Sequence, residues 1–321
     1  MHRIETILSA AALLVAASAC TPSTTNATIA GSAASVESAA DTPKRVAPTV
    51  HTVTASPEGI VVNAYLVETP EGVVAIDSAL TVSDAKKLRE KLDSLKKPLL
   101  AVLLTHGHPD HYNGVTALVE GRPDTPIYST AEVAKVIAAD DAKKEALWKP
   151  MFKEQWPDKR TFPNHEIASG TKLDLGGLSF TVFAVGPGES HADSYWVLDA
   201  DRRYVFVGDV VLHGVHAYVS DGHTTPWLET LARLRRELDG AGVLYPGHGP
   251  AGGVELLDWQ TRYLESYRAS VERLREGREK LSDDAKKTLI ADMKQKYPDA
   301  ALDFLIGLGA DAVASELARA H

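Results

Sequence analysis

The sequence predicts an α/β fold in which helices pack outside a β-sheet, and three observations point to it. Residues 50–77 hold short runs of β-branched residues separated by Pro-Glu-Gly turns, which is typical of an antiparallel meander. Residues 98–105 form one apolar run that indicates a fully buried strand. Strand and helix patterns then alternate between residues 112 and 139, as expected when helices cover a sheet.

The first half of the chain begins with three predicted strands, at residues 50–55, 61–68 and 73–77. Ser83 can cap the helix that follows. The apolar stripe of this helix consists of Ala85, Leu88, Leu92 and Leu95. After the buried strand we expect a short helix, a short strand and a second helix, at residues 112–120, 126–129 and 131–139.

Residues 140–165 interrupt this rhythm. The segment is charged except for five large apolar side chains, Leu147, Trp148, Met151, Phe152 and Trp156. We interpret it as a packed excursion of the chain, with a lid over the functional site as the alternative.

The second half of the chain is predicted to contain two hairpins, one helix, a last short strand and a helical end. They cover residues 173–185, 195–207, 225–238, 243–245 and 254–320. We therefore expect a catalytic domain over residues 48–253 and a C-terminal helical extension, residues 254–321, packed on it.

Residues 1–19 are predicted to be an export signal. A basic start precedes an apolar run too short to anchor the chain in a bilayer, and Ala17-Ser18-Ala19 is typical of a cleavage site. Cys20, the single cysteine, follows directly, and this order resembles a bacterial lipobox. The prediction is a periplasmic protein anchored by lipid on Cys20, with plain secretion as the alternative. Residues 20–47, rich in Ser, Thr and Ala, are expected to be a flexible tether.

The composition narrows the class of partner. With 44% hydrophobic and 24% charged residues, the chain has the make-up of an ordinary globular protein. A formal charge of −9 argues against nucleic acid, which usually needs a concentrated positive surface. We therefore expect a small-molecule substrate, and contact with a membrane only through Cys20.

The segment His106-Gly107-His108-Pro109-Asp110-His111 carries the strongest chemical signal. In an extended or tightly turned chain, His106 and His108 point to the same side and can bind one ion through imidazole nitrogen. Asp110 and His111 can then turn toward a second ion nearby. This spacing directly after a buried strand is far more specific than a lone His-x-His, so we interpret it as a metal site rather than a histidine-rich loop.

Three further candidates share one context. His191, Asp209 and His248 each lie in a glycine-bearing loop just after an apolar strand. A sheet whose strand ends converge would gather these loops at one edge, beside the first motif. The joint appearance of the four signals favours a single site.

Taken in order, these motifs resemble the metallo-β-lactamase superfamily, in its glyoxalase II and lactonase-like branch. The resemblance implies an αββα sandwich, in which two mixed β-sheets lie face to face with helices outside, and a dinuclear metal site along one edge. It implies that His106, His108 and His191 bind the first metal and that Asp110, His111 and His248 bind the second. Asp209 would bridge the two.

The implied cofactor is a pair of zinc ions per chain, with iron or manganese as other options, because the donors are imidazole and carboxylate without thiolate. Two such ions can lower the pKa of a bridging water to around neutrality and polarise a carbonyl group. Hydrolysis of an ester, thioester, lactone or amide follows. We infer in addition that Asp110 is catalytic, orienting the hydroxide and passing a proton to the leaving group.

Other functions stay open. A β-lactam hydrolase is favoured by export, but enzymes of that branch usually carry cysteine or serine where Asp209 stands. An iron-dependent oxidoreductase similar to persulfide dioxygenases would use the same ligand cage. A catalytically silent binding protein is disfavoured because all seven ligand positions are filled.

Overall fold

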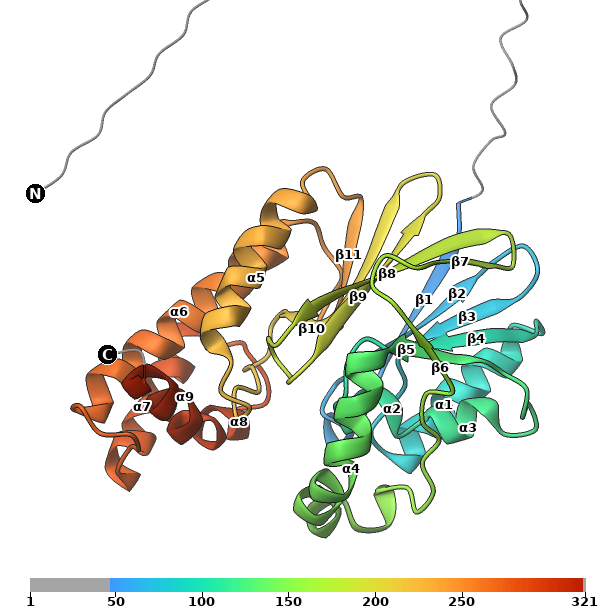
Figure 1. Ribbon diagram of the computed structural model, residues 1–321. Helices are drawn as coiled ribbons and strands as arrows, with labels where there is room; N and C mark the ends of the chain where they lie inside the picture. Colours follow the sequence, from blue (N-terminus) through green and yellow to red (C-terminus); the bar gives the residue numbers. More distant parts are fainter. Residues whose placement is uncertain (1–46, 320–321) are drawn as a thin grey trace, which may run out of the picture. The chain divides into compact units, whose positions relative to one another are not determined.

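The computed structural model describes residues 47–319, which form two mixed β-sheets packed face to face, with helices on their outer sides (Figure 1). This arrangement confirms the predicted αββα sandwich. The first sheet has the strand order β1-β2-β3-β4-β5-β6 and the second the order β11-β10-β9-β8-β7.

The first sheet changes from antiparallel to parallel at its middle. Its strands are β1 (Thr49–Thr54), β2 (Asn63–Glu68), β3 (Val73–Ile76), β4 (Leu99–Leu103), β5 (Ile127–Thr130) and β6 (His165–Ile167). The first three pair antiparallel, as the meander predicts, and β3 to β6 pair parallel. Parallel neighbours need a crossover, which helix α1 (Val82–Ser94) supplies between β3 and β4.

The second sheet is antiparallel except at one edge. Its strands are β7 (Lys172–Leu175), β8 (Leu178–Gly186), β9 (Asp193–Asp199), β10 (Arg203–Leu212) and β11 (Val243–His248). Strands β7 to β10 form two successive hairpins, and β11 runs parallel to β10. Helix α5 (Thr224–Glu237) makes the crossover that this parallel pair requires.

The remaining helices cover the outer faces and the C-terminal part of the chain. They are α2 (Pro109–Tyr112), α3 (Val115–Val119), α4 (Ala131–Phe152), α6 (Glu255–Arg275), α7 (Asp283–Lys296), α8 (Phe304–Leu308) and α9 (Ala310–Arg319). Two short 3-10 turns lie at Pro57–Gly59 and Lys153–Gln155.

Two local predictions need correction. Helix α4 does not stop near residue 139 but continues to Phe152, with Pro150 in its last turn, so the hydrogen bond that the proline removes lies close to the helix end. The cap of α1 is Thr81 rather than Ser83, because the Thr81 side chain accepts a hydrogen bond from the Asp84 N–H.

Apolar side chains fill the space between the sheets. The contributors from the two inner faces include Tyr65, Ile76, Leu103, Phe180, Trp196 and Phe206. Fully burying a side chain of this size contributes about 1.5–3 kcal/mol. The sheets are therefore joined by one continuous core, and their strand ends are held at fixed positions.

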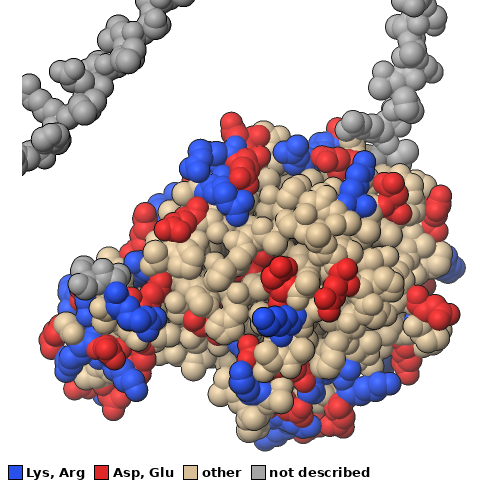
Figure 2. Space-filling view, in the orientation of Figure 1, with Lys and Arg blue, Asp and Glu red and all other residues tan. Residues whose placement is uncertain are grey.

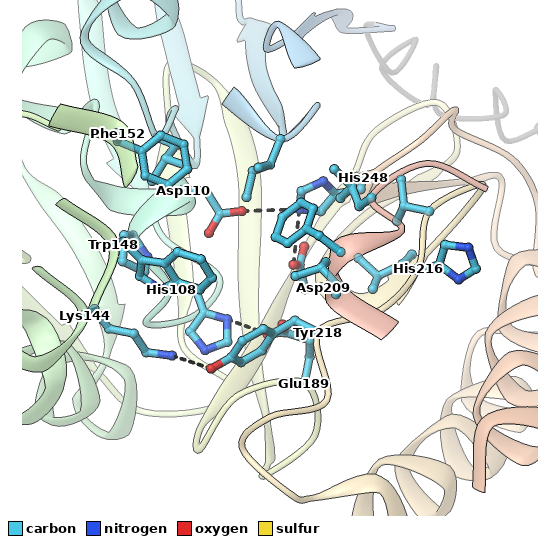
Figure 3. A pocket seen from close by; sticks show the side chains of 18 residues that line it. His108, Asp110, Lys144, Trp148, Phe152, Glu189, Asp209, His216, Tyr218 and His248 are labelled. Atoms are coloured by element: carbon cyan, nitrogen blue, oxygen red, sulfur yellow. Dashed lines mark hydrogen bonds and ion pairs between the residues drawn. The ribbon is translucent and has the colours of Figure 1, made fainter. Parts of the chain in front are cut away.

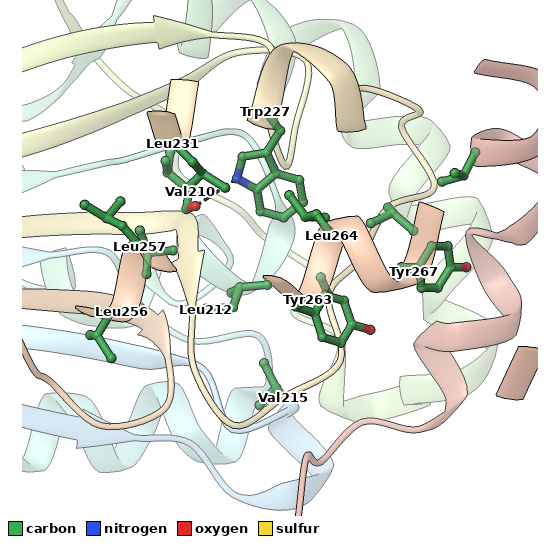
Figure 4. Close-up of a cluster of buried hydrophobic side chains, with 14 of the residues drawn as sticks. Val210, Leu212, Val215, Trp227, Leu231, Leu256, Leu257, Tyr263, Leu264 and Tyr267 are labelled. Atoms are coloured by element: carbon green, nitrogen blue, oxygen red, sulfur yellow. Dashed lines mark hydrogen bonds between the residues drawn. The ribbon is translucent and has the colours of Figure 1, made fainter. Parts of the chain in front are cut away.

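Helices α5 and α6 cover the outer face of the second sheet (Figure 4). Trp227 of α5 is fully buried, and its indole Nε1 donates to the carbonyl oxygen of Val210 at 2.8 Å. Tyr263 of α6 packs in the same cluster as Leu212. This packing fixes the end of β10, from which one of the predicted metal ligands projects.

The predicted signal peptide, Cys20 and all of the tether before residue 47 lie outside the described residues. Among the helices of residues 47–319, none combines the length and the apolar character that a membrane crossing requires.

Candidate metal centre

The histidine motif lies where β4 leaves the first sheet. His108 has extended backbone angles and stands at the N-cap of α2, with Pro109 at the first helical position, where its missing N–H costs nothing. The preceding Thr105 is held by Asp77, which accepts hydrogen bonds from the Thr105 N–H at 2.9 Å and from its hydroxyl at 2.7 Å. The motif therefore starts from a fixed backbone position.

The second sheet supplies the other functional side chains from three neighbouring strands. Glu189 lies in the loop between β8 and β9, Asp209 lies near the end of β10, and His248 ends β11. Gly247 leaves room for this arrangement, because a Cβ atom there would lie 1.7 Å from Asp209 Oδ1. A side chain at position 247 would displace the Asp209 carboxylate.

Asp110, His111, Asp209 and His248 form the first group, which we call the aspartate cluster. Their facing ligand atoms lie within 4.8 Å of one another, and all four side chains are buried. His111 Nε2 lies 3.2 Å from Asp209 Oδ1 and 3.3 Å from Asp110 Oδ2. His248 Nε2 lies 3.3 Å from Asp110 Oδ2 and 3.4 Å from Asp209 Oδ2. The predicted ligands of the second metal are thus brought together.

His106, His108 and Glu189 form the second group, which we call the glutamate cluster. Glu189 Oε2 lies 2.8 Å from His108 Nδ1 and 3.5 Å from His106 Nε2. Asp209 Oδ2 lies 4.0 Å from His106 Nε2, so Asp209 stands between the two clusters, as predicted for a bridging ligand.

The structure does not bring His191 into either cluster, which corrects the prediction that it completes the first metal site. Its side chain is 46% exposed, and its Nδ1 lies 2.7 Å from His223 Nε2. The reason is a tight turn, closed by hydrogen bonds from the Ser190 N–H and hydroxyl to the Asp193 carboxylate. This turn directs Glu189 inward and His191 outward.

Outer residues hold the histidine rings in place. His111 Nδ1 lies 2.9 Å from Asp77 Oδ2, and His108 Nε2 lies 3.2 Å from Asp221 Oδ2. A carboxylate on the far nitrogen fixes the orientation and tautomer of an imidazole ligand. Sequence reasoning missed Glu189, Asp77 and Asp221. Asp77 could have been found from the sequence, because it directly follows an apolar strand, which is the signal that pointed to Asp209.

The clusters contain polar atoms that lack partners. Within residues 47–319, the buried side-chain atoms without a well-aligned hydrogen bond include four candidate ligand atoms, namely His106 Nε2, His111 Nε2, Glu189 Oε2 and Asp209 Oδ1. Leaving such an atom unsatisfied costs about 1–3 kcal/mol. A cation between them would satisfy the imidazole nitrogens and the carboxylate oxygens at once, and this donor set suits zinc, iron or manganese. The residues therefore fit the divalent ions that the resemblance implies.

Ion pairing shifts the pKa values in both clusters. Burial lowers the pKa of His108, but the carboxylates of Glu189 and Asp221 together outweigh it and raise the pKa to about 10. In the same way Asp209 and Asp110 together outweigh burial at His248 and raise its pKa to about 10. Burial raises the pKa of Glu189 to about 8. Without a cation, the protons on His108 and His248 therefore offset the negative charge of the neighbouring carboxylates.

A pocket opens above both clusters (Figure 3). His108, Asp110, Glu189, Asp209 and His248 line its floor, and most of the rest of its lining is apolar. In Figure 3 the side chains labelled on α4 face the pocket from the side opposite Asp209 and His248. A substrate in the pocket would therefore lie directly against the candidate ligands.

The sequence and the fold are similar to those of known proteins. The model of the metallo-beta-lactamase superfamily matches residues 57–248, which include both clusters. A metallo-beta-lactamase type 2 of Bacillus sp. (strain 170) is 24% identical over 205 residues, 62% of this chain and 71% of that protein. A hydroxyacylglutathione hydrolase of Neisseria gonorrhoeae is 24% identical over 145 residues, 45% of this chain and 47% of the relative.

Among solved structures, a protein in a di-iron-bound form is 30% identical, with a TM-score of 0.50. The match covers 64% of this chain and 96% of that protein.

Proposed function

The chain belongs to the metallo-beta-lactamase superfamily, whose members among its relatives are hydrolases, and on this premise we propose that it cleaves an ester, thioester, lactone or amide with two divalent cations. The observation that carries the proposal is the pair of buried clusters at the floor of one pocket. Zinc is the proposed metal.

In this proposal the glutamate cluster holds one cation and the aspartate cluster the other, with Asp209 between them. When bound, such ions polarise the scissile carbonyl and lower the pKa of a water toward neutrality. Glu189 takes the ligand position that the sequence assigned to His191. The change keeps a ligand there but replaces a neutral imidazole by a carboxylate.

Asp110 is the proposed catalytic residue. Its carboxylate lines the pocket and lies between His111 and His248, which hold its pKa well below the usual range although burial alone would raise it. An ionised carboxylate at this place can orient the attacking water, accept its proton and deliver that proton to the leaving group.

A small-molecule substrate is favoured over a polyanion. On the face shown in Figure 2, acidic and basic side chains are interspersed among larger uncharged areas. The formal charge of −9 adds to the electrostatic cost of bringing up nucleic acid.

An iron-dependent oxidoreductase is the second candidate, because two observations favour it. The glutamate cluster has two histidines and one carboxylate, a set that non-haem iron enzymes also use. One solved relative is described as di-iron-bound. A β-lactam hydrolase is supported by the names of relatives, whereas Asp209 at the position between the clusters argues against it.

The experiment that tests the function combines metal analysis with a substrate panel. We expect the purified full chain to contain about two zinc ions and to hydrolyse a thioester or a lactone faster than a nitrocefin-type β-lactam or a phosphodiester. Bound iron together with oxygen consumption on a persulfide would replace hydrolysis by the oxidoreductase. Two bound cations without turnover of any substrate would contradict both.

We also propose that the protein is exported and anchored in the periplasm by lipid on Cys20. The supporting observation is the order of basic start, apolar run and Ala-Ser-Ala-Cys at the beginning of the chain. A Cys20→Ser variant should lose labelling by fatty acid and leave the membrane fraction. Unchanged membrane association of that variant would contradict the lipid anchor.

A further inference from the structure

The pocket above the metal clusters is polar at its floor and apolar at its walls. Its empty space, counted together with the open mouth, is about 620 Å³. The apolar wall residues come from three distant parts of the chain. They include Ile60, Trp148, Phe152, Leu302, Phe304 and Leu305.

Two of these wall residues are held in a strained backbone conformation. Ile60 has a φ of 56° and Leu302 a φ of 67°, in the left-handed region that side chains with a Cβ atom rarely adopt. Each such residue costs on the order of 1–3 kcal/mol and persists only where its surroundings impose it. The surroundings of Ile60 and Leu302 therefore fix the backbone from which both side chains reach the pocket wall.

The C-terminal part of this wall is fixed to the metal-bearing half of the fold. The Ala301 N–H donates to the Gly214 carbonyl at 2.9 Å, and the His216 N–H donates to the Ala301 carbonyl at 2.8 Å. These bonds fix the backbone beside Leu302 to the loop that follows β10. Backbone hydrogen bonds therefore fix this part of the wall relative to the second sheet, which carries metal ligands.

Apolar side chains at the mouth remain exposed to water. Phe304 of α8 is 48% exposed although it lines the pocket, and Trp148 and Phe152 face the pocket from α4. An apolar group reaching from the floor to the mouth would cover them and gain about 0.8 kcal/mol per buried methylene.

We propose that the pocket selects substrates in which an aliphatic acyl chain of medium length is attached to the bond that is cleaved. The carbonyl lies at the polar floor, and the chain runs outward between α4 and the segment from Leu302 to Leu305. This inference rests on the proposed hydrolase function and names the class of its substrate.

The test compares esters that share one leaving group and differ in acyl length, from acetate to octanoate. After correction for reactivity with hydroxide, kcat/KM should rise by on the order of 10-fold or more, the value for two fully buried methylenes. Phe304→Ser should reduce the octanoate-to-acetate ratio several-fold. Leu308→Ser is the matched control, because Leu308 lies on the same helix, is 44% exposed and is not among the residues lining the pocket.

Calorimetric binding of octanoate and acetate to the metal-loaded full chain separates this inference from the hydrolase function. Tighter binding of octanoate that Phe304→Ser abolishes supports the apolar subsite even if no ester is cleaved. Hydrolysis that is equally fast for acetate and octanoate esters overturns the inference and leaves the function standing. Octanoate that binds no better than acetate also overturns it, as does a dimer whose second copy closes the mouth.

Discussion

The aspartate cluster and the glutamate cluster are neighbours, but they are built differently. In the aspartate cluster two histidines face two carboxylates, and both histidines have raised pKa values because Asp209 and Asp110 together outweigh burial. In the glutamate cluster one histidine is paired with Glu189, whereas burial keeps the pKa of His106 well below its usual value. The two metal positions therefore differ in charge, and we expect them to differ in their affinity for a cation.

The largest effect is expected from Asp209→Ala, because this carboxylate stands between both clusters. Metal content should fall from about two ions to less than one, and kcat/KM by on the order of 1,000-fold. His108→Ala should likewise remove most activity. Circular dichroism serves as the control for folding, and a variant that keeps both ions and full activity would refute the shared site.

The variant Glu189→Gln distinguishes the two clusters, because it should affect metal binding at only one of them. Removing its charge should empty the glutamate cluster while the aspartate cluster keeps its ion, with a loss of roughly 100-fold in activity. His191→Ala is the matched control two residues away, and it should leave metal content and activity in place. If His191→Ala lost a metal and Glu189→Gln did not, the assignment of the loop would be reversed.

Asp221→Asn should weaken metal binding through His108, the metal ligand that its carboxylate contacts. Because Asp221 holds the far nitrogen of this ring, metal affinity at the glutamate cluster should fall about 10–100-fold. Competition with a chelator measures the affinity of each position. An equal loss at both clusters would show that Asp221 has a general structural role instead.

The number of protons released on metal binding is the smallest expected difference between the two clusters, and it compares them directly. A histidine with a raised pKa holds a proton below that pKa and must lose it to bind metal, so affinity should rise with pH and level off above the pKa, near 10 for His108 and His248. From pH 8 to pH 10 the aspartate cluster, with two such histidines, should release more protons than the glutamate cluster. Calorimetry in buffers of different ionisation enthalpy counts them, and equal counts would contradict the asymmetry.

The contrast also shows how much of the candidate site can be predicted from the sequence alone. The aspartate cluster could be predicted completely, because two of its members are adjacent in one motif and the others end strands of a sheet. Position along the chain predicts that these loops meet at one edge of the fold, and the family resemblance implies their grouping around one metal.

The glutamate cluster could be predicted only in part. Glu189 and His191 lie two residues apart in a loop, and the Ser190–Asp193 turn decides which of them points inward. The hydrophobic periodicity of the sequence does not indicate which way a side chain points in such a turn. Asp221 gave no signal at all, because it lies in a loop without a strand before it and its partner is more than a hundred residues away.

One feature of the sandwich reaches beyond catalysis. The histidine motif belongs to the first sheet, whereas Glu189, Asp209 and His248 belong to the second, and between these sheets the core consists of apolar contacts. An ion held in either cluster is therefore a crosslink between the two halves of the fold. A free ion concentration of 100 times its Kd would add roughly 2.7 kcal/mol to the free energy of unfolding, so the amount of metal available would set how long the folded protein survives heat or denaturant.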